Sequence, residues 1–165
     1  MIVSRPLSSS TANFELIEAA TFTGTSKTFS GLDGNTDIGY FLRLKLAGGA
    51  SASNISINFN GVTSGYTFNS NLNNGGSLSG SAGNGNQFSQ VQPNSYVVGF
   101  MFISAVSGFP RQIHTFHTTT TTSGSVDSST DRVIHWAELI TNVTSIRLTF
   151  SASLATSRAE LFRIR

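Results

Sequence analysis

Hydrophobic and polar residues alternate with a period of two in several short segments of the chain. In residues 39–46, three leucines at alternate positions are separated by Arg43 and Lys45. Residues 54–60 and 145–151 repeat the alternation with Ile, Leu and Phe. Because successive side chains of a β-strand point to opposite faces, this period predicts strands with one buried and one polar face. Antiparallel sheets commonly have that division.

Short apolar runs of this kind continue along most of the chain, separated by clusters of Gly, Asn and Ser. Such a pattern is typical of an all-β sandwich or barrel. The strands that it predicts are residues 14–22, 27–32, 39–46, 54–60, 66–69, 87–92, 96–105, 112–119, 132–140, 145–151 and 159–165. We expect two long loops, at 71–86 and 118–130, and essentially no helix. Together these elements predict an all-β fold, a two-sheet antiparallel sandwich with Greek-key or jelly-roll topology.

Residues 96–106 depart from the alternation, since Val, Phe, Met and Ile occupy positions of both parities. A strand that is buried on both faces has such a continuous apolar run. We therefore expect a central strand here, with one face in the core and the other against another subunit.

A chain of 165 residues is long enough for one compact domain with a sizeable core. Residues 1–12 are rich in Ser and include Pro6, which favours an extended conformation. We therefore expect an N-terminal arm at 1–12, docked on a neighbouring subunit, and a single β-sandwich domain at 13–165.

Charged residues are only 11% of the chain, against about 25% in an ordinary soluble domain. Much of the surface must therefore consist of neutral hydroxyl and amide groups, which favours a subunit that is buried against others in an assembly. The net charge of +2 is small, and the chain has no clustered basic face of the kind that indicates nucleic-acid binding. We therefore expect no nucleic-acid partner. The nearest cluster, Arg158, Arg163 and Arg165, is expected to be solvated or to face a subunit.

Several classes of protein are disfavoured by what the chain lacks. It has no cysteine, which excludes disulfides and Cys-ligated metal centres. Residues 1–11 lack the apolar segment of a signal peptide, and no run of about 18 apolar residues predicts a membrane span. We expect no membrane partner.

Residues with catalytic or metal-binding chemistry are scattered along the chain. His114 and His117 are the closest histidine pair, but residues three apart on a strand point to opposite faces, so we expect no shared metal ion. The chain has no Gly-x-Ser-x-Gly motif, which serine hydrolases use. It also has no pair of carboxylates that the predicted strands bring together, as a glycosidase requires. The Gly-rich segment 80–85 does not open a helix after a strand, as nucleotide-binding loops do. We therefore expect no catalytic residue and no cofactor, and hence no enzyme.

Aromatic residues offer an alternative function in binding. Tyr66 and Trp136 each combine a flat apolar face with a polar edge, as contacts to sugars require. These two residues are our candidate ligand-binding positions for a host surface glycan. In this alternative, segments 71–86 and 118–130 form the exposed tip of the domain.

One motif resembles a known family. Phe59-Asn60-Gly61 ends an alternating strand and is followed by Tyr66, a pattern similar to that of small jelly-roll virion proteins of tailed bacteriophages. The preceding strand Tyr40-Phe-Leu-Arg-Leu-Lys-Leu resembles the strand before the motif in that family. Further along the chain, Ser145-Ile-Arg-Leu-Thr-Phe and Ala159-Glu-Leu-Phe-Arg-Ile resemble the last two strands of the family. The resemblance covers about half of the chain.

The resemblance implies a structural component of the virion that has no enzymatic activity. Such proteins often assemble as trimers, so the implied partners are other copies of the chain and the major capsid protein or another virion protein. We expect a capsid decoration or cement subunit whose arm, with Arg5, Pro6 and Leu7, anchors it to the capsid. The alternative is a tail-associated or fibre-associated module that binds a receptor or carbohydrate.

Overall fold

The computed structural model describes residues 13–74, 77–121 and 123–165. In this part of the chain the protein is all-β and antiparallel, with 70% strand and no helix. The arm expected at 1–12, with its candidate anchoring residues Arg5, Pro6 and Leu7, lies outside the described residues.

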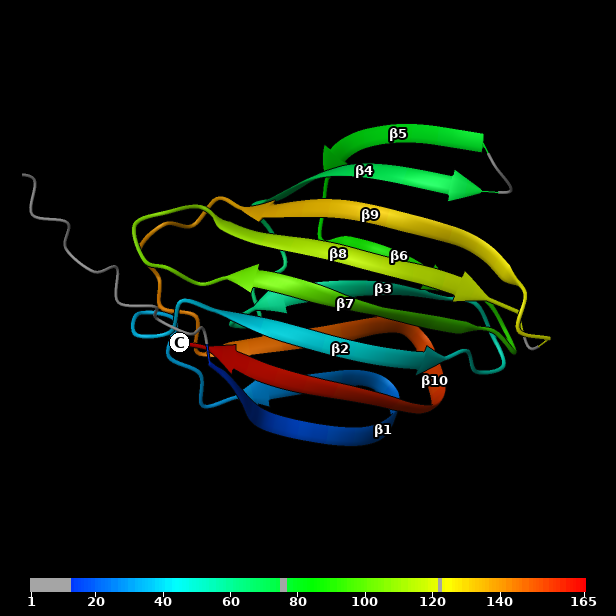
Figure 1. The fold of residues 1–165 in the computed structure, drawn as a ribbon, viewed down its shortest axis with the longest axis horizontal. Helices are drawn as coiled ribbons and strands as arrows, with labels where there is room; N and C mark the ends of the chain where they lie inside the picture. Colours follow the sequence, from blue (N-terminus) through cyan, green and yellow to red (C-terminus); the bar gives the residue numbers. More distant parts are fainter. Residues whose placement is uncertain (1–12, 75–76, 122) are drawn as a thin grey trace, which may run out of the picture.

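Ten described strands form one sheet, which curls on itself (Figure 1). The strands are β1 (Phe14–Ser30), β2 (Gly39–Ala47), β3 (Ser53–Phe59), β4 (Tyr66–Asn74), β5 (Ser77–Asn84), β6 (Gln87–Val91), β7 (Tyr96–Ser104), β8 (Arg111–Thr120), β9 (Val126–Trp136) and β10 (Ser145–Ile164). Their order is β5-β4-β9-β8-β7-β2-β10-β3-β6, and β1 pairs with β10 beside this path. Strands β3 and β6 lie behind β7 and β8 in Figure 1, so the curl produces two facing layers.

Two long strands, β1 and β10, bend and pass through the curl, although the sequence pattern predicts two separate strands in place of each. Strand β10 pairs with β3 through its first part, up to Phe150, and with β2 from Arg158 onward. Its partner β1 shifts register around Gly24, which has a φ of 98°. Irregular pairing of this kind bends a strand. The segments expected as separate strands at 14–22 and 27–32, and at 145–151 and 159–165, are therefore two continuous bent strands.

The core lies between the two layers and follows the alternation read from the sequence. The side chains of Leu42, Leu44 and Leu46 are buried, whereas Arg43 and Lys45 are exposed on the outer face. Strand β3 and the first part of β10 contribute the facing apolar residues Ile55, Ile57, Phe59, Ile146, Leu148 and Phe150. These predictions are confirmed.

Two segments expected as loops are instead hairpins. In the first, β4 and β5 pair from Thr67 with Asn84 to Asn74 with Ser77, because main-chain hydrogen bonds need no apolar side chains. Gly83 leaves room for the Phe68 ring, since a β-carbon there would lie 3.1 Å from it. In the second, β8 extends to Thr120 and β9 begins at Val126.

Asn60 explains why the Phe-Asn-Gly motif ends β3. Its φ is 52°, a left-handed conformation that Asn tolerates better than most residues. Its side-chain oxygen accepts hydrogen bonds from the Thr144 amide, the Thr144 hydroxyl and the Ser145 amide at 2.8, 3.0 and 3.1 Å. Its side-chain nitrogen donates to the Asn142 carbonyl at 2.6 Å. The turn after β3 therefore holds the start of β10.

Replacing Asn60 by alanine is expected to lower the free energy of unfolding by about 2–4 kcal/mol, because four hydrogen bonds are lost at a left-handed position. Asn94 has a similar φ of 56° and is exposed, so Asn94→Ala measures the backbone cost alone, about 1 kcal/mol. Urea denaturation of both variants gives the comparison. Equal losses would show that the side-chain bonds of Asn60 contribute nothing.

Candidate assembly surface

Apolar side chains cover the outer face of the sheet across five neighbouring strands. We call this surface the aromatic face and define it by Phe14, Leu16, Phe41, Val98, Phe100, Phe102, Phe116 and Phe162. It runs over β1, β10, β2, β7 and β8, which lie side by side in Figure 1. Each of these residues occupies the strand parity opposite to that of the core.

The strand register places the rings next to one another. Phe162 pairs across strands with Phe41, and Phe41 pairs with Phe102. Their ring centroids lie 6.0 and 5.0 Å apart. Phe100 lies at the centre, with its ring 5.8 Å from Phe41, 5.9 Å from Phe102 and 5.3 Å from Phe116. Such cross-strand aromatic contacts stabilise the sheet and keep the side chains ordered.

Much of this apolar surface remains accessible to solvent. The exposed fraction is 39% for Phe100 and 41% for Phe102, and it rises to 55% for Phe14 at the edge. A contiguous exposed apolar patch on a soluble chain marks an interaction surface. The inner face of β7 lies in the core, as expected, and the outer face, which we expect to meet another subunit, is exposed in the single chain.

Charged residues adjoin the aromatic face in two places. A hollow beside Val98 is lined by Arg43, Lys45 and Arg158, on β2 and β10. Glu160 forms ion pairs with both arginines, which leaves an excess of positive charge there. Exposed Asp131, on β9, pairs across strands with Phe116 and lines a second hollow. The surface therefore has a basic region and an acidic region.

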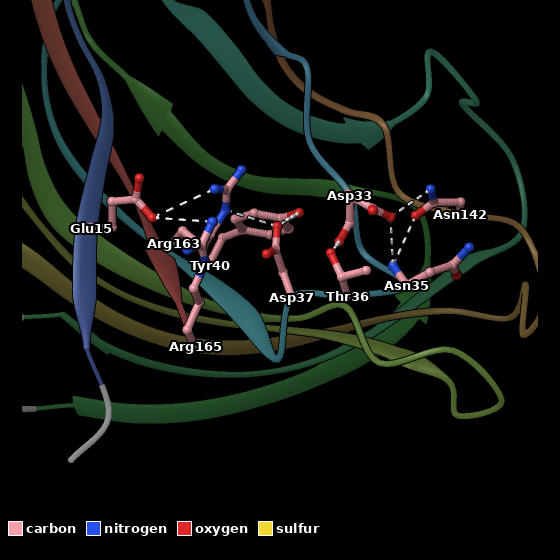
Figure 2. A network of polar contacts seen from close by, with 9 residues as sticks. All are labelled: Glu15, Asp33, Asn35, Thr36, Asp37, Tyr40, Asn142, Arg163 and Arg165. Atoms are coloured by element: carbon pink, nitrogen blue, oxygen red, sulfur yellow. Dashed lines mark hydrogen bonds and ion pairs between the residues drawn. The ribbon is translucent and has the colours of Figure 1, made fainter. Parts of the chain in front are cut away.

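A polar network anchors the end of the aromatic face near the C-terminus (Figure 2). The guanidinium of Arg163 donates to Asp37 at 3.0 Å and lies 3.5 Å from Glu15. Arg165 forms a second ion pair with Glu15. The Tyr40 hydroxyl also donates to the buried carboxylate of Asp37, at 2.7 Å. These contacts join β1, β2 and β10. With the ion pair between Arg158 and Glu160, all three C-terminal arginines are paired within the chain.

Asp33 belongs to the same region and orders the turn before β2. Its carboxylate accepts hydrogen bonds from the Asn35 amide at 3.2 Å and from the Asn142 side chain at 3.0 Å (Figure 2). The hydrogen bond from Asn142 is the main cause that holds the pKa of Asp33 below its usual value. The turn role that Asp-Gly-Asn sequences favour is therefore present here.

The two candidate ligand-binding aromatics lie in the core. Tyr66 and Trp136 are each 3% exposed and stack with ring centroids 5.9 Å apart. The Tyr66 hydroxyl accepts a hydrogen bond from the Phe59 amide at 2.8 Å, and burial raises the Tyr66 pKa to about 12. Neither ring presents a face on which a glycan could stack. Their structural role is to hold the turn between β3 and β4.

The histidines lie as the strand geometry predicted. His117 is buried, and His114, three residues away, lies on the opposite, partly exposed face of β8. Among residues 13–74, 77–121 and 123–165, no group of three or more His, Asp or Glu side chains is arranged to hold a metal ion.

The burial of His117 predicts a pH dependence of stability. Desolvation lowers the pKa of His117 to about 4 from an ordinary value of 6.5, so the unfolded chain binds the proton more tightly. The neutral His117 therefore contributes its full share to the free energy of unfolding above pH 6.5. As the pH falls toward 4, that free energy decreases by up to about 3 kcal/mol. Urea denaturation between pH 7 and 4 should show a flatter profile for His117→Gln than for the unmodified chain. A profile for His117→Gln as steep as that of the unmodified chain would contradict this assignment.

Comparisons with known proteins give no match: no family model matches the chain, and no curated protein does. No helix in the described part of the chain is long and apolar enough to cross a membrane.

Proposed function

We propose that this protein is a non-enzymatic structural subunit of a tailed-phage virion that assembles through its aromatic face. The observation that carries the proposal is the aromatic face, which spans five strands and includes the exposed rings of Phe14, Phe100, Phe102 and Phe116. Burying such a surface against a second protein contributes about 25 cal/mol for each Å² of apolar area. The scarcity of charged residues agrees with a subunit that works inside an assembly.

The occupant of the aromatic face is a second copy of the chain. Positive charge gathers at Arg43, Lys45 and Arg158, and negative charge at Asp131 on β9. An interface that brings the basic region of one copy against Asp131 of the next is head-to-tail, and it forms a closed ring where the rotation between copies closes. We propose that it closes as a trimer, the assembly that the resemblance to virion proteins implies.

The resemblance of Phe59-Asn60-Gly61 and Tyr66 to small jelly-roll virion proteins supports the virion assignment. The continuous curled sheet is then a variant of the jelly roll, in which β1 and β10 pass through the curl and connect the two layers. We propose a decoration or cement role on the capsid, in contact with the major capsid protein.

Locating the subunit on purified particles of the virus that encodes it tests this proposal. Cryo-electron microscopy should show three-fold density on the capsid surface into which three copies fit. Density on the tail would overturn the decoration role and retain the virion role. Particles that contain no copy of the chain, judged by mass spectrometry, would overturn both.

A further inference from the structure

A polar cavity lies where the curled sheet fails to close. The two strands at the ends of the sheet, β5 and β6, follow each other in sequence but belong to different layers. Between them is a cavity of about 340 Å³, lined by residues of β4, β5, β6, β8 and β9. Its walls include parts of both hairpins, at 71–86 and 118–130, the two segments that the glycan-binding alternative makes the exposed tip of the domain. The aromatic face lies on the outside of the sheet, so the cavity is a separate feature.

Arg132 supplies positive charge to the cavity without an acidic partner. Its guanidinium donates to the Gln87 carbonyl and, at 3.4 Å, to the Ser70 hydroxyl, and it stacks 4.4 Å from the Phe68 ring centroid. None of the ion pairs in the described part of the chain involves Arg132. Its buried Nε has no hydrogen-bond partner among the described residues. A half-buried cation without a counter-ion favours the binding of an anion.

His117 contributes a second unsatisfied group to the same cavity. It is 7% exposed, and its buried Nδ1 has no hydrogen-bond partner among the described residues. Its ring packs edge-on against Phe88, with centroids 5.8 Å apart. Buried polar atoms without partners are rare in folded proteins, and a ligand can satisfy them.

The rest of the lining suits a polyhydroxylated molecule. Most of the remaining side chains are neutral hydroxyls and amides, together with the apolar groups Phe88 and Leu72 and the exposed carboxylate Asp127. Hydroxyls and amides can both donate and accept hydrogen bonds, as sugar hydroxyls do. The volume is at the lower end of small-molecule sites, which begin at about 300 Å³.

We propose that this cavity binds a sugar acid, a single sugar ring that carries one carboxylate, with the carboxylate directed to Arg132 and the hydroxyls to the Ser, Thr and Gln side chains. This site is independent of assembly through the aromatic face. A subunit that binds no sugar could still assemble, and the reverse also holds, so the two proposals fail separately.

The experiment titrates the full-length ¹⁵N-labelled protein with D-glucuronate and follows the backbone amides by NMR. We expect saturable shifts concentrated on residues that line the cavity, including Gln87, Ser89 and Thr130. D-glucose, which has the ring without the carboxylate, should bind at least about tenfold more weakly, as should acetate, which has only the carboxylate. Equal binding of glucose would overturn the role of Arg132, and equal binding of acetate would overturn the sugar assignment. No saturable shift with glucuronate would overturn the site.

Two substitutions on β5 provide a matched pair. Ser81 lines the cavity, whereas its neighbour Ala82 points to the opposite side of the strand. Ser81→Tyr should fill the cavity and weaken glucuronate binding at least about tenfold, while Ala82→Tyr should leave it unchanged. Both positions are exposed on an edge strand, where tyrosine is well tolerated. Arg132→Lys, which keeps the charge but lacks Nε, should also weaken binding, and unchanged binding in both Ser81→Tyr and Arg132→Lys would overturn the proposal.

Discussion

The substitution Phe100→Asp is expected to convert the assembled protein into folded monomers. Phe100 lies at the centre of the aromatic face, where its ring contacts Phe41, Phe102 and Phe116. A carboxylate at the centre of an apolar interface must lose its hydration, and Arg43, opposite it on β2, is already paired with Glu160. The cost is therefore several kcal/mol in each interface. In the monomer the new carboxylate remains hydrated and lies across from Arg43 on β2, so we expect the fold to persist. Analytical ultracentrifugation measures the mass, and circular dichroism checks the fold.

Phe109 provides the matched control for this prediction. It is 64% exposed, lies in the connection between β7 and β8, and is not among the residues that define the aromatic face. Phe109→Asp adds the same charge and removes the same ring, so it should leave the assembly intact. If both variants dissociate, the effect is one of general solubility. If neither dissociates, the copies meet through another surface.

The second large effect is expected from Arg111→Leu, which should lower the free energy of unfolding by about 3–5 kcal/mol. Arg111 is fully buried, and its guanidinium donates to the carbonyls of Val106, Phe109 and Leu139 at 2.7, 2.8 and 3.0 Å. A fourth bond reaches the Thr141 carbonyl at 3.1 Å. Leucine fills part of the volume but removes all four bonds. The Leu139 carbonyl keeps a hydrogen bond from the Gly108 amide at 2.9 Å, whereas the other three carbonyls lose the guanidinium donor. Each buried group left unsatisfied costs about 1–3 kcal/mol.

Two further substitutions separate the hydrogen bonds of Arg111 from its charge. Arg111→Lys keeps the charge and some donors, so we expect an intermediate loss of stability. Arg147→Leu, at an exposed position of β10, should change the free energy of unfolding by less than about 0.5 kcal/mol. Urea denaturation at one fixed protomer concentration gives all three values, because assembly also stabilises the folded state. A loss in Arg111→Leu as small as that in Arg147→Leu would contradict the role assigned to the four carbonyl contacts.

The alternation of Leu42, Leu44 and Leu46 predicted both strand β2 and its buried face. A period of two is typical of a strand, and the parity of the leucines indicates which face is buried. The same reasoning failed for β5, where every residue is exposed and no apolar period exists. Strand β5 forms through main-chain pairing with β4, which side-chain patterns do not report. The continuity of β1 and β10 through their bends could not be predicted either, since Gly24 and the Ser-Ala-Ser segment 151–153 have the composition of a loop.

Only part of the aromatic face could be predicted from the sequence. The apolar residues of both parities in β7 indicated a second covered face, and the structure places Phe100 and Phe102 on that outer face. The partners that make it a continuous surface, such as Phe162 from β10, are distant in sequence and meet only through the sheet order. The burial of Arg111 and Arg132 could not be predicted, because an isolated arginine in a strand has the same sequence pattern whether it is solvated or buried.

Sedimentation of the unmodified chain over a range of concentrations tests the central claim most directly. Assembly through the aromatic face as a trimer predicts a mass three times the 17.5 kDa of one chain, falling toward 17.5 kDa only on strong dilution. A mass of 17.5 kDa that persists at the highest concentration would contradict the account, because the aromatic face would then remain exposed without a second copy to cover it.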